Sequence, residues 1–148
     1  MSEENVERVR GFLEVWSGRK WLFEDQALAF EQVFSHDAAT ALIDPDTVFE
    51  DAVLPDNAGE EYRGIDGVRR ASARWMEDYE WLLAELDRII DADERVVSIQ
   101  KAKMKMRHTA IEFETPLAYV WTFRGGKLIH YQGFIDVGAA LKAAGLEG

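Results

Sequence analysis

The spacing of hydrophobic residues changes from a helical to a strand-like period near the middle of the chain. In the first half, apolar residues recur every three or four positions in three segments, which is typical of amphipathic helices. The first segment runs from Val6 to Trp16, the second spans residues 27–34, and the third follows Gly64 and Gly67 and runs to Tyr79. A short strand is expected at residues 47–51, after the helix-ending Asp44-Pro45-Asp46.

The second half alternates between apolar and polar residues, which predicts long strands. Two strands are expected at residues 81–92 and 95–108, and two more meet at the Gly125-Gly126 turn. In the second strand, Gln100, Ala102, Met104 and Met106 should face inward, whereas Lys101, Lys103, Lys105 and Arg107 should face solvent. A short helix ends the pattern, and Asp136 is its expected N-cap. Helices followed by a meander of strands indicate one α+β domain over residues 1–148, with a bent antiparallel sheet over helices.

One face of the strand that precedes Gly125 suggests a lined cavity. Leu117, Tyr119, Trp121 and Phe123 share this face at period two, and two of them carry polar atoms. The polar loop of residues 54–64 is expected to cover its mouth. A cavity wall is also a core face, so packing against the sheet is the alternative interpretation for these aromatic residues.

The composition excludes several classes of function. The chain has 148 residues, no cysteine and a net charge of −11, which argues against binding to nucleic acid or to an anionic membrane surface. The N-terminus lacks a signal-peptide pattern, and no apolar run reaches membrane-spanning length. The three histidines have no metal-site spacing, and no nucleotide-binding motif is present. We therefore expect a cytoplasmic protein with no metal and no cofactor.

Asp51 is the strongest candidate for a catalytic residue. It ends a short strand among apolar neighbours with no adjacent lysine or arginine. Desolvation at a cavity rim would raise the pKa of such a carboxyl group towards values useful for proton transfer. The alternative is a strand-end aspartate that caps the following loop. Tyr119 and Tyr131 are candidate donors to a carbonyl or enolate oxygen in the cavity, or else core aromatics.

Two motifs in their order and spacing resemble a known family. YRGIDGVRR spans Tyr62–Arg70 and YVWTFRGGK spans Tyr119–Lys127. With the other elements they make nearly the whole chain similar to SnoaL-like proteins of the nuclear transport factor 2-like superfamily. The resemblance implies a cone, in which a strongly bent sheet wraps around a long helix, and a homodimer formed through the sheet. It marks the fold well and the activity poorly, since this superfamily hosts several enzymes and also non-enzymes.

The resemblance also assigns roles to individual positions. Asp51 is similar in position to the general base of ketosteroid isomerases, and Tyr119 falls where those enzymes place a protonated carboxyl donor. Phe12 falls where their catalytic tyrosine lies, but phenylalanine has no donor. Gly133 falls where polyketide cyclases and limonene epoxide hydrolases have a catalytic aspartate. Neither set of catalytic residues is therefore intact.

Two functions remain open at this point, beside the possibility of a dimeric protein with a filled pocket and no ligand. The first is an enzyme without metal or nucleotide, in which Asp51 shuttles a proton and Tyr119 stabilises an oxyanion on a small apolar carbonyl compound. The second is a non-catalytic module that binds a hydrophobic ligand. The expected ligand-binding residues are Phe12, Trp16, Trp75, Tyr79, Met104, Trp121 and Tyr131.

Assembly is predicted from the outer face of the sheet. The alternation of side chains places four apolar residues on this outer face: Val97, Ile99, Val120 and Phe134. If they are exposed, these apolar residues imply a partner surface, and a homodimer is the commonest solution.

Overall fold

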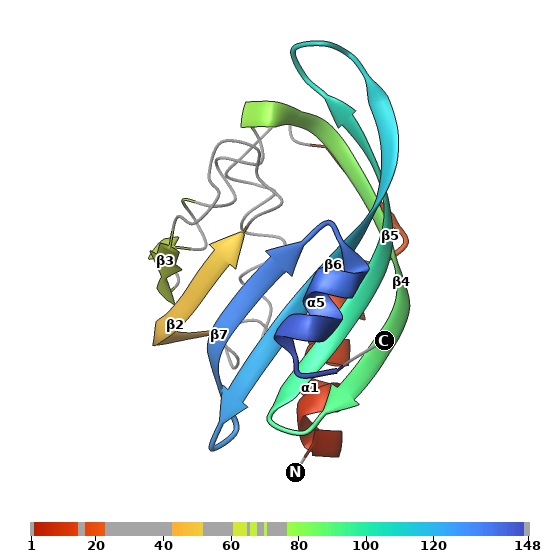
Figure 1. The fold of residues 1–148 in the computed structure, drawn as a ribbon. Coiled ribbons are helices and arrows are strands. Elements are labelled where there is room, and N and C mark those ends of the chain that lie inside the picture. The colour runs from red at the N-terminus through yellow and green to blue at the C-terminus, as the bar shows by residue number, and fades with distance from the viewer. Residues whose placement is uncertain are drawn as a thin grey trace.

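A computed structural model describes residues 2–14, 17–22, 43–51, 61–64, 66–67, 70 and 77–146 of the chain. Its named elements are α1 (Ser2–Glu14), β1 (Arg19–Leu22), β2 (Ile43–Asp51), β3 (Glu61–Arg63), β4 (Tyr79–Ala92), β5 (Arg95–Met106), β6 (Glu112–Arg124), β7 (Lys127–Phe134) and α5 (Val137–Ala143). The expected α+β cone is confirmed (Figure 1). None of the helices in these ranges is long and apolar enough to span a membrane.

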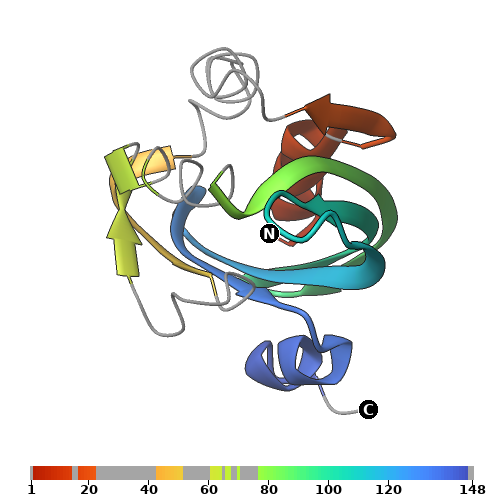
Figure 2. The same ribbon diagram turned by 90° about the horizontal axis from the view of Figure 1, so that it is seen from above.

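The described strands form one curled, unclosed sheet with the order β1-β4-β5-β6-β7-β2-β3. Every neighbouring pair is antiparallel except β2 and β7, which are parallel. The long strands β4, β5 and β6 bend strongly, α1 lies on their concave side, and α5 lies on the opposite, convex side (Figure 2). The sheet therefore has an inner face towards α1 and an outer face that is partly covered by α5.

The predicted alternation of β5 is confirmed. Lys101 and Lys103 are exposed, whereas Gln100, Ala102 and Met104 are buried. Lys103 also forms an ion pair across to β6, at 3.5 Å from Glu114. Both side chains of this pair are largely exposed to solvent, so the interaction adds little to stability.

The first helix and the last hairpin also follow their patterns. Val9 and Leu13 of α1 are almost fully buried against the inner face. Gly125 and Gly126 both have positive φ angles, 58° and 80°. Such a pair suits the tight turn between β6 and β7, because two-residue hairpin turns often require the left-handed region at both positions.

Three expected boundaries were wrong. Tyr79 was assigned to a helix, but it is the first residue of β4 and pairs with Met106 of β5. Glu61–Arg63 was taken as part of the polar loop, but it is β3 and pairs with β2. Strand β2 starts at Ile43, before the expected residue 47, with an irregular register between Ile43 and Val48.

The early start of β2 has a local cause around Asp44. The Thr47 hydroxyl accepts a hydrogen bond from the Asp44 backbone N–H at 2.9 Å and donates to the Leu128 carbonyl of β7 at 2.6 Å. The Asp44 carboxylate accepts from the Asp46 backbone N–H, and this bond together with Lys127 holds the pKa of Asp44 below its usual value. These contacts join β2 to β7 despite Pro45.

The outer apolar residues are not exposed as the assembly argument assumed. Val97, Ile99 and Val120 do lie on the outer face, but they are at most 5% exposed. They form a separate core with Ala140 and Ala144, and Phe134 packs against it. The Asp136 side chain caps α5 by accepting from the Ala139 N–H, as predicted. The premise of a free apolar face is therefore wrong, because the closing helix covers it.

Candidate functional site

The sheet register places three of the positions singled out in the sequence, together with Ser98, in one row across the sheet, which we term the register row. Asp51 of β2 pairs with Gly133 of β7, Gly133 pairs with Tyr119 of β6, and Tyr119 pairs with Ser98 of β5. Adjacent strands lie about 4.8 Å apart, so roughly 10 Å separates the backbones of Asp51 and Tyr119. The residue between them is a glycine, which has no side chain. No side chain of β7 therefore separates the two positions within this row.

Only part of the predicted site lies within the described structure. The backbone of Asp51 is described but its side chain is not, and Trp16 and Trp75 lie outside the described residues. The predicted site residues whose side chains are described are Phe12, Tyr79, Met104, Tyr119, Trp121 and Tyr131.

Five aromatic side chains form a connected group on the inner face, which we term the aromatic cluster: Phe12, Phe49, Tyr119, Trp121 and Tyr131. Tyr131 is its centre. Its ring stacks on Tyr119 at 4.8 Å with an angle of 16° between the ring planes. Two further ring contacts of Tyr131 are edge-on, with Trp121 at 4.6 Å and Phe49 at 5.3 Å. Phe12 of α1 meets Trp121 at 5.4 Å. Aromatic pairs of this kind add about 0.5–1.5 kcal/mol beyond area burial.

The aromatic cluster thus unites four of the predicted residues and adds Phe49, which the sequence analysis missed. Phe49 lies in the short strand that contains Asp51, two positions away. Alternation along that strand would have placed both residues on one face. The two stacked tyrosines are the members of the aromatic cluster that carry a phenol group.

Tyr79 and Met104 lie in another part of the same core. Both are buried, and Tyr79 contacts Phe113 with ring centroids 6.3 Å apart. Met104 pairs with Phe113 across β5 and β6. Phe113 precedes Tyr119 by six residues, or about 20 Å along an extended strand. Only an elongated ligand would reach from the aromatic cluster to Tyr79. The assignment of Tyr79 and Met104 as ligand-binding residues stays a prediction.

Two polar side chains of β5 face the same interior. Ser98 is fully buried, and its Oγ accepts a hydrogen bond of 2.8 Å from Nε1 of Trp121. Gln100 is 4% exposed and lies two positions further along the inner face. The sequence analysis placed Gln100 inward but assigned it no role, and it did not consider Ser98. The signal for both was a polar residue at an inward position of a strand.

The ionisable residues next to the site face the other way. His130 and Gln132 flank Tyr131 in β7, and both contact the Glu50 carboxylate. The Gln132 amide donates to Glu50 at 2.9 Å, and His130 Nε2 lies 3.4 Å from the same oxygen. Within the described residues, no group of three or more histidine, aspartate or glutamate side chains is placed to hold a metal ion.

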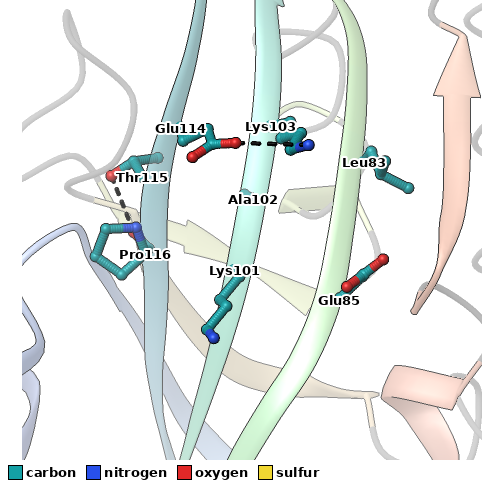
Figure 3. Close-up of a pocket in the computed structure, with 8 residues that line it drawn as sticks. All are labelled: Leu83, Glu85, Lys101, Ala102, Lys103, Glu114, Thr115 and Pro116. Atoms are coloured by element: carbon teal, nitrogen blue, oxygen red, sulfur yellow. Dashed lines mark hydrogen bonds and ion pairs between the residues drawn. The ribbon is translucent and has the colours of Figure 1, made fainter.

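A hollow of about 390 Å³ lies on the outer face of β4, β5 and β6 (Figure 3). It is lined by Leu83, Glu85, Lys101, Ala102, Lys103, Glu114, Thr115 and Pro116. Figure 3 shows the Glu114 carboxylate directed at the Lys103 ammonium group. The hollow is separated from the aromatic cluster by the sheet itself.

The comparison with protein families identifies the family. A profile of the SnoaL-like domain matches residues 9–131. The chain belongs to the SnoaL-like family. This match covers α1 from Val9 onward, all seven strands except the end of β7, and the whole aromatic cluster. A comparison with curated proteins found no match.

Solved structures show the same fold at low sequence identity. An NTF2-like protein from Burkholderia thailandensis is 23% identical, with a TM-score of 0.67 and coverage of 92% of this chain and 95% of that one. An NTF2-like protein of unknown function from Burkholderia pseudomallei is 17% identical, with a TM-score of 0.67 and coverage of 94% and 95%. A putative SnoaL-like polyketide cyclase from Jannaschia is 16% identical, with a TM-score of 0.63 and coverage of 97% and 92%. These likenesses establish the fold.

Proposed function

We propose that this SnoaL-like protein is a cofactor-free enzyme that transfers a proton on a small, apolar, carbonyl-bearing molecule. Asp51 would take the proton, and the Tyr119 phenol would donate a hydrogen bond to the oxyanion that forms. The single observation that supports this proposal most is the register row, in which Gly133 separates Asp51 from Tyr119. A base and an oxyanion donor on opposite sides of a space for the substrate are the minimum that enolisation requires.

The surroundings of Tyr119 support a role beyond packing. The residue is 7% exposed, so a phenol–oxyanion hydrogen bond there would form in a largely water-free environment. Such bonds are worth more at low dielectric than in water. The stacked ring of Tyr131 holds the Tyr119 ring in place. A donor fixed before the reaction needs no reorganisation as charge develops.

A non-catalytic ligand-binding module is the second candidate. Two departures from related enzymes favour it, since Phe12 has no donor and Gly133 has no carboxyl group. The aromatic cluster alone offers an apolar wall on which a ring compound can lie. The two functions share the pocket and differ in whether bound ligand exchanges protons.

An exchange experiment with 2-tetralone, an apolar ring ketone with acidic α-protons, separates the two functions. We expect the protein to accelerate exchange of these protons with D₂O, because Asp51 and Tyr119 together would stabilise the enolate. Proton NMR follows the loss of the α-proton signals, with buffer alone as the reference. Binding without acceleration would favour the ligand-binding module, and no binding would contradict both functions.

We also propose that the protein is a homodimer, now with a different surface from the one the sequence suggested. The outer face around the hollow in Figure 3 has lysines along β5 and carboxylates along both neighbouring strands. Lys105 lies 3.3 Å from Glu80 of β4, and Lys103 lies 3.5 Å from Glu114 of β6. A second copy, turned about a two-fold axis and offset by one strand, would place its basic row over an acidic row.

Light scattering at micromolar concentration should give twice the chain mass of 16.9 kDa. Lys103→Glu should weaken the dimer, because it puts a like charge between two acidic rows. Lys142→Glu, on the last turn of α5, is the matched control and should leave the mass unchanged. A monomeric wild-type protein would contradict the dimer, and a dimer that tolerates Lys103→Glu would contradict this surface.

A further inference from the structure

Gln100 is a buried polar side chain in an apolar section of the inner face. Its cross-strand neighbours are Leu86 of β4 and Leu117 of β6. The other polar residue nearby, Ser98, already accepts the indole N–H of Trp121. Within the described residues, the Gln100 side chain has no hydrogen-bond partner. Burial of an amide without a partner is costly, so this position calls for an explanation.

The Gln100 amide is not sealed inside the protein. Within the described part of the chain, the only side-chain oxygen that is both closed off from solvent and without a hydrogen-bond partner belongs to Asp78. The residue Gln100 as a whole is nevertheless only 4% exposed. Its amide therefore keeps a small solvent-accessible surface, at which a ligand atom can replace water.

A β-bulge lies directly opposite Gln100. The pairing of β4 with β5 passes from Leu86 and Gln100 to Arg88 and Ile99, so Asp87 is an extra residue. Bulges bend the strand, increase its twist and re-aim side chains, and they are over-represented next to binding and active sites. This irregularity is a second observation, independent of burial, that marks the same place on the sheet.

We infer that Gln100 is a specificity-determining residue that binds an oxygen substituent of a ring-shaped ligand lying against the Tyr119–Tyr131 pair. This inference rests on the pocket of the proposed function, and it adds the chemistry of the ligand. Gln100 is the diagonal neighbour of Tyr119, because Ser98 pairs with Tyr119 and Gln100 pairs with Leu117. Diagonal neighbours are about 7–8 Å apart, within reach of long side chains.

The amide group defines which substituent fits. Glutamine offers an N–H donor and a carbonyl acceptor, so a ring hydroxyl can use either atom and a ring carbonyl can use the donor. A ligand without an oxygen atom next to Gln100 would exclude water from the amide and leave it without a hydrogen-bond partner. Sites that hydrogen-bond a polar substituent discriminate strongly against the analogue that lacks it. The favoured ligand is therefore an apolar ring system with a hydroxyl or oxo group.

Two probes of nearly equal shape test the inference, 2-naphthol and 2-methylnaphthalene. Their dissociation constants are measured by ¹⁵N–¹H NMR titration with the wild-type protein and with Gln100→Met, which preserves length but removes both polar atoms. We expect the preference for 2-naphthol over 2-methylnaphthalene to fall about three- to tenfold in Gln100→Met, the worth of one hydrogen bond. Comparing ratios between proteins cancels the difference in hydrophobicity between the probes.

Gln132→Met is the matched control, since Gln132 lies on the other face of the sheet and bonds to Glu50. Its probe preference should equal that of the wild type. If Gln100→Met does not fold, the side-chain NH₂ signals of the wild type decide, because those of Gln100 should shift with 2-naphthol and not with 2-methylnaphthalene. An unchanged preference in folded Gln100→Met, or no such shift, overturns the inference while 2-tetralone exchange still supports the proposed function. Failure of both probes to bind contradicts the pocket, and with it the role of Gln100.

Discussion

Asp51→Asn should lower the rate of 2-tetralone proton exchange by about a hundredfold to ten-thousandfold, the usual contribution of a general base. Asparagine has the size and hydrogen-bonding shape of aspartate but cannot accept a proton. The dissociation constant for 2-tetralone should change little, because the substitution leaves the aromatic cluster intact. The free energy of unfolding should hold or rise slightly, since a neutral amide is cheaper to desolvate than a carboxylate.

The control for this substitution is Asp46→Asn, an exposed aspartate in the same strand. It removes one negative charge from β2 without touching the register row, and exchange should proceed at the wild-type rate. Equal rates for Asp51→Asn and the wild type would defeat the catalytic assignment. If Asp51 only caps the following loop, the substitution should be silent in binding, exchange and stability alike.

Tyr119→Phe should lower the same exchange rate by about a hundredfold to a thousandfold, as expected for loss of one preorganised oxyanion donor. Phenylalanine keeps the ring that stacks on Tyr131 at 4.8 Å and removes only the hydroxyl group. The affinity for 2-tetralone should therefore change far less than the rate. The measurement is the ratio of exchange rates at saturating ketone.

Tyr79→Phe is a matched control for Tyr119→Phe, because Tyr79 is also a buried strand tyrosine but contacts Phe113 at 6.3 Å instead of the aromatic cluster. Exchange should be unaffected by it. If both substitutions reduce exchange equally, the effect is a general loss of core packing and not a lost oxyanion donor. A wild-type rate in Tyr119→Phe would leave Asp51 without its proposed partner and favour a different donor, with Tyr131 the nearest phenol.

Membership of the SnoaL-like family determines the fold of this protein but does not determine its reaction mechanism. The same cone supports several chemistries, because a pocket formed between a bent sheet and helices can be lined differently at each position. In this chain, phenylalanine at position 12 packs its ring against Trp121, and glycine at position 133 has no side chain. A mechanism here must use residues other than these two, which is why the proposal depends on Asp51 and Tyr119 alone.

Patterns that depend on neighbours in the chain were predicted correctly. The alternation of β5, the glycine turn before β7 and the cap of α5 by Asp136 each follow from local backbone geometry. Tyr79 was misassigned because a helical spacing of apolar residues continued past the point where pairing with Met106 imposes a strand. Here the tertiary contact overrode the local pattern.

Which residues face inward was determined by the sequence alone, because side chains alternate between the faces of any strand. Which of them meet was decided only by the tertiary structure. Asp51 and Gly133 come together through a parallel pairing of strands far apart in the chain, and no local signal sets that register. The cover of α5 over Val97 and Val120 is likewise a long-range contact. The alternation of apolar residues showed that the outer face of the sheet must be buried. Only the tertiary structure shows that α5 buries it.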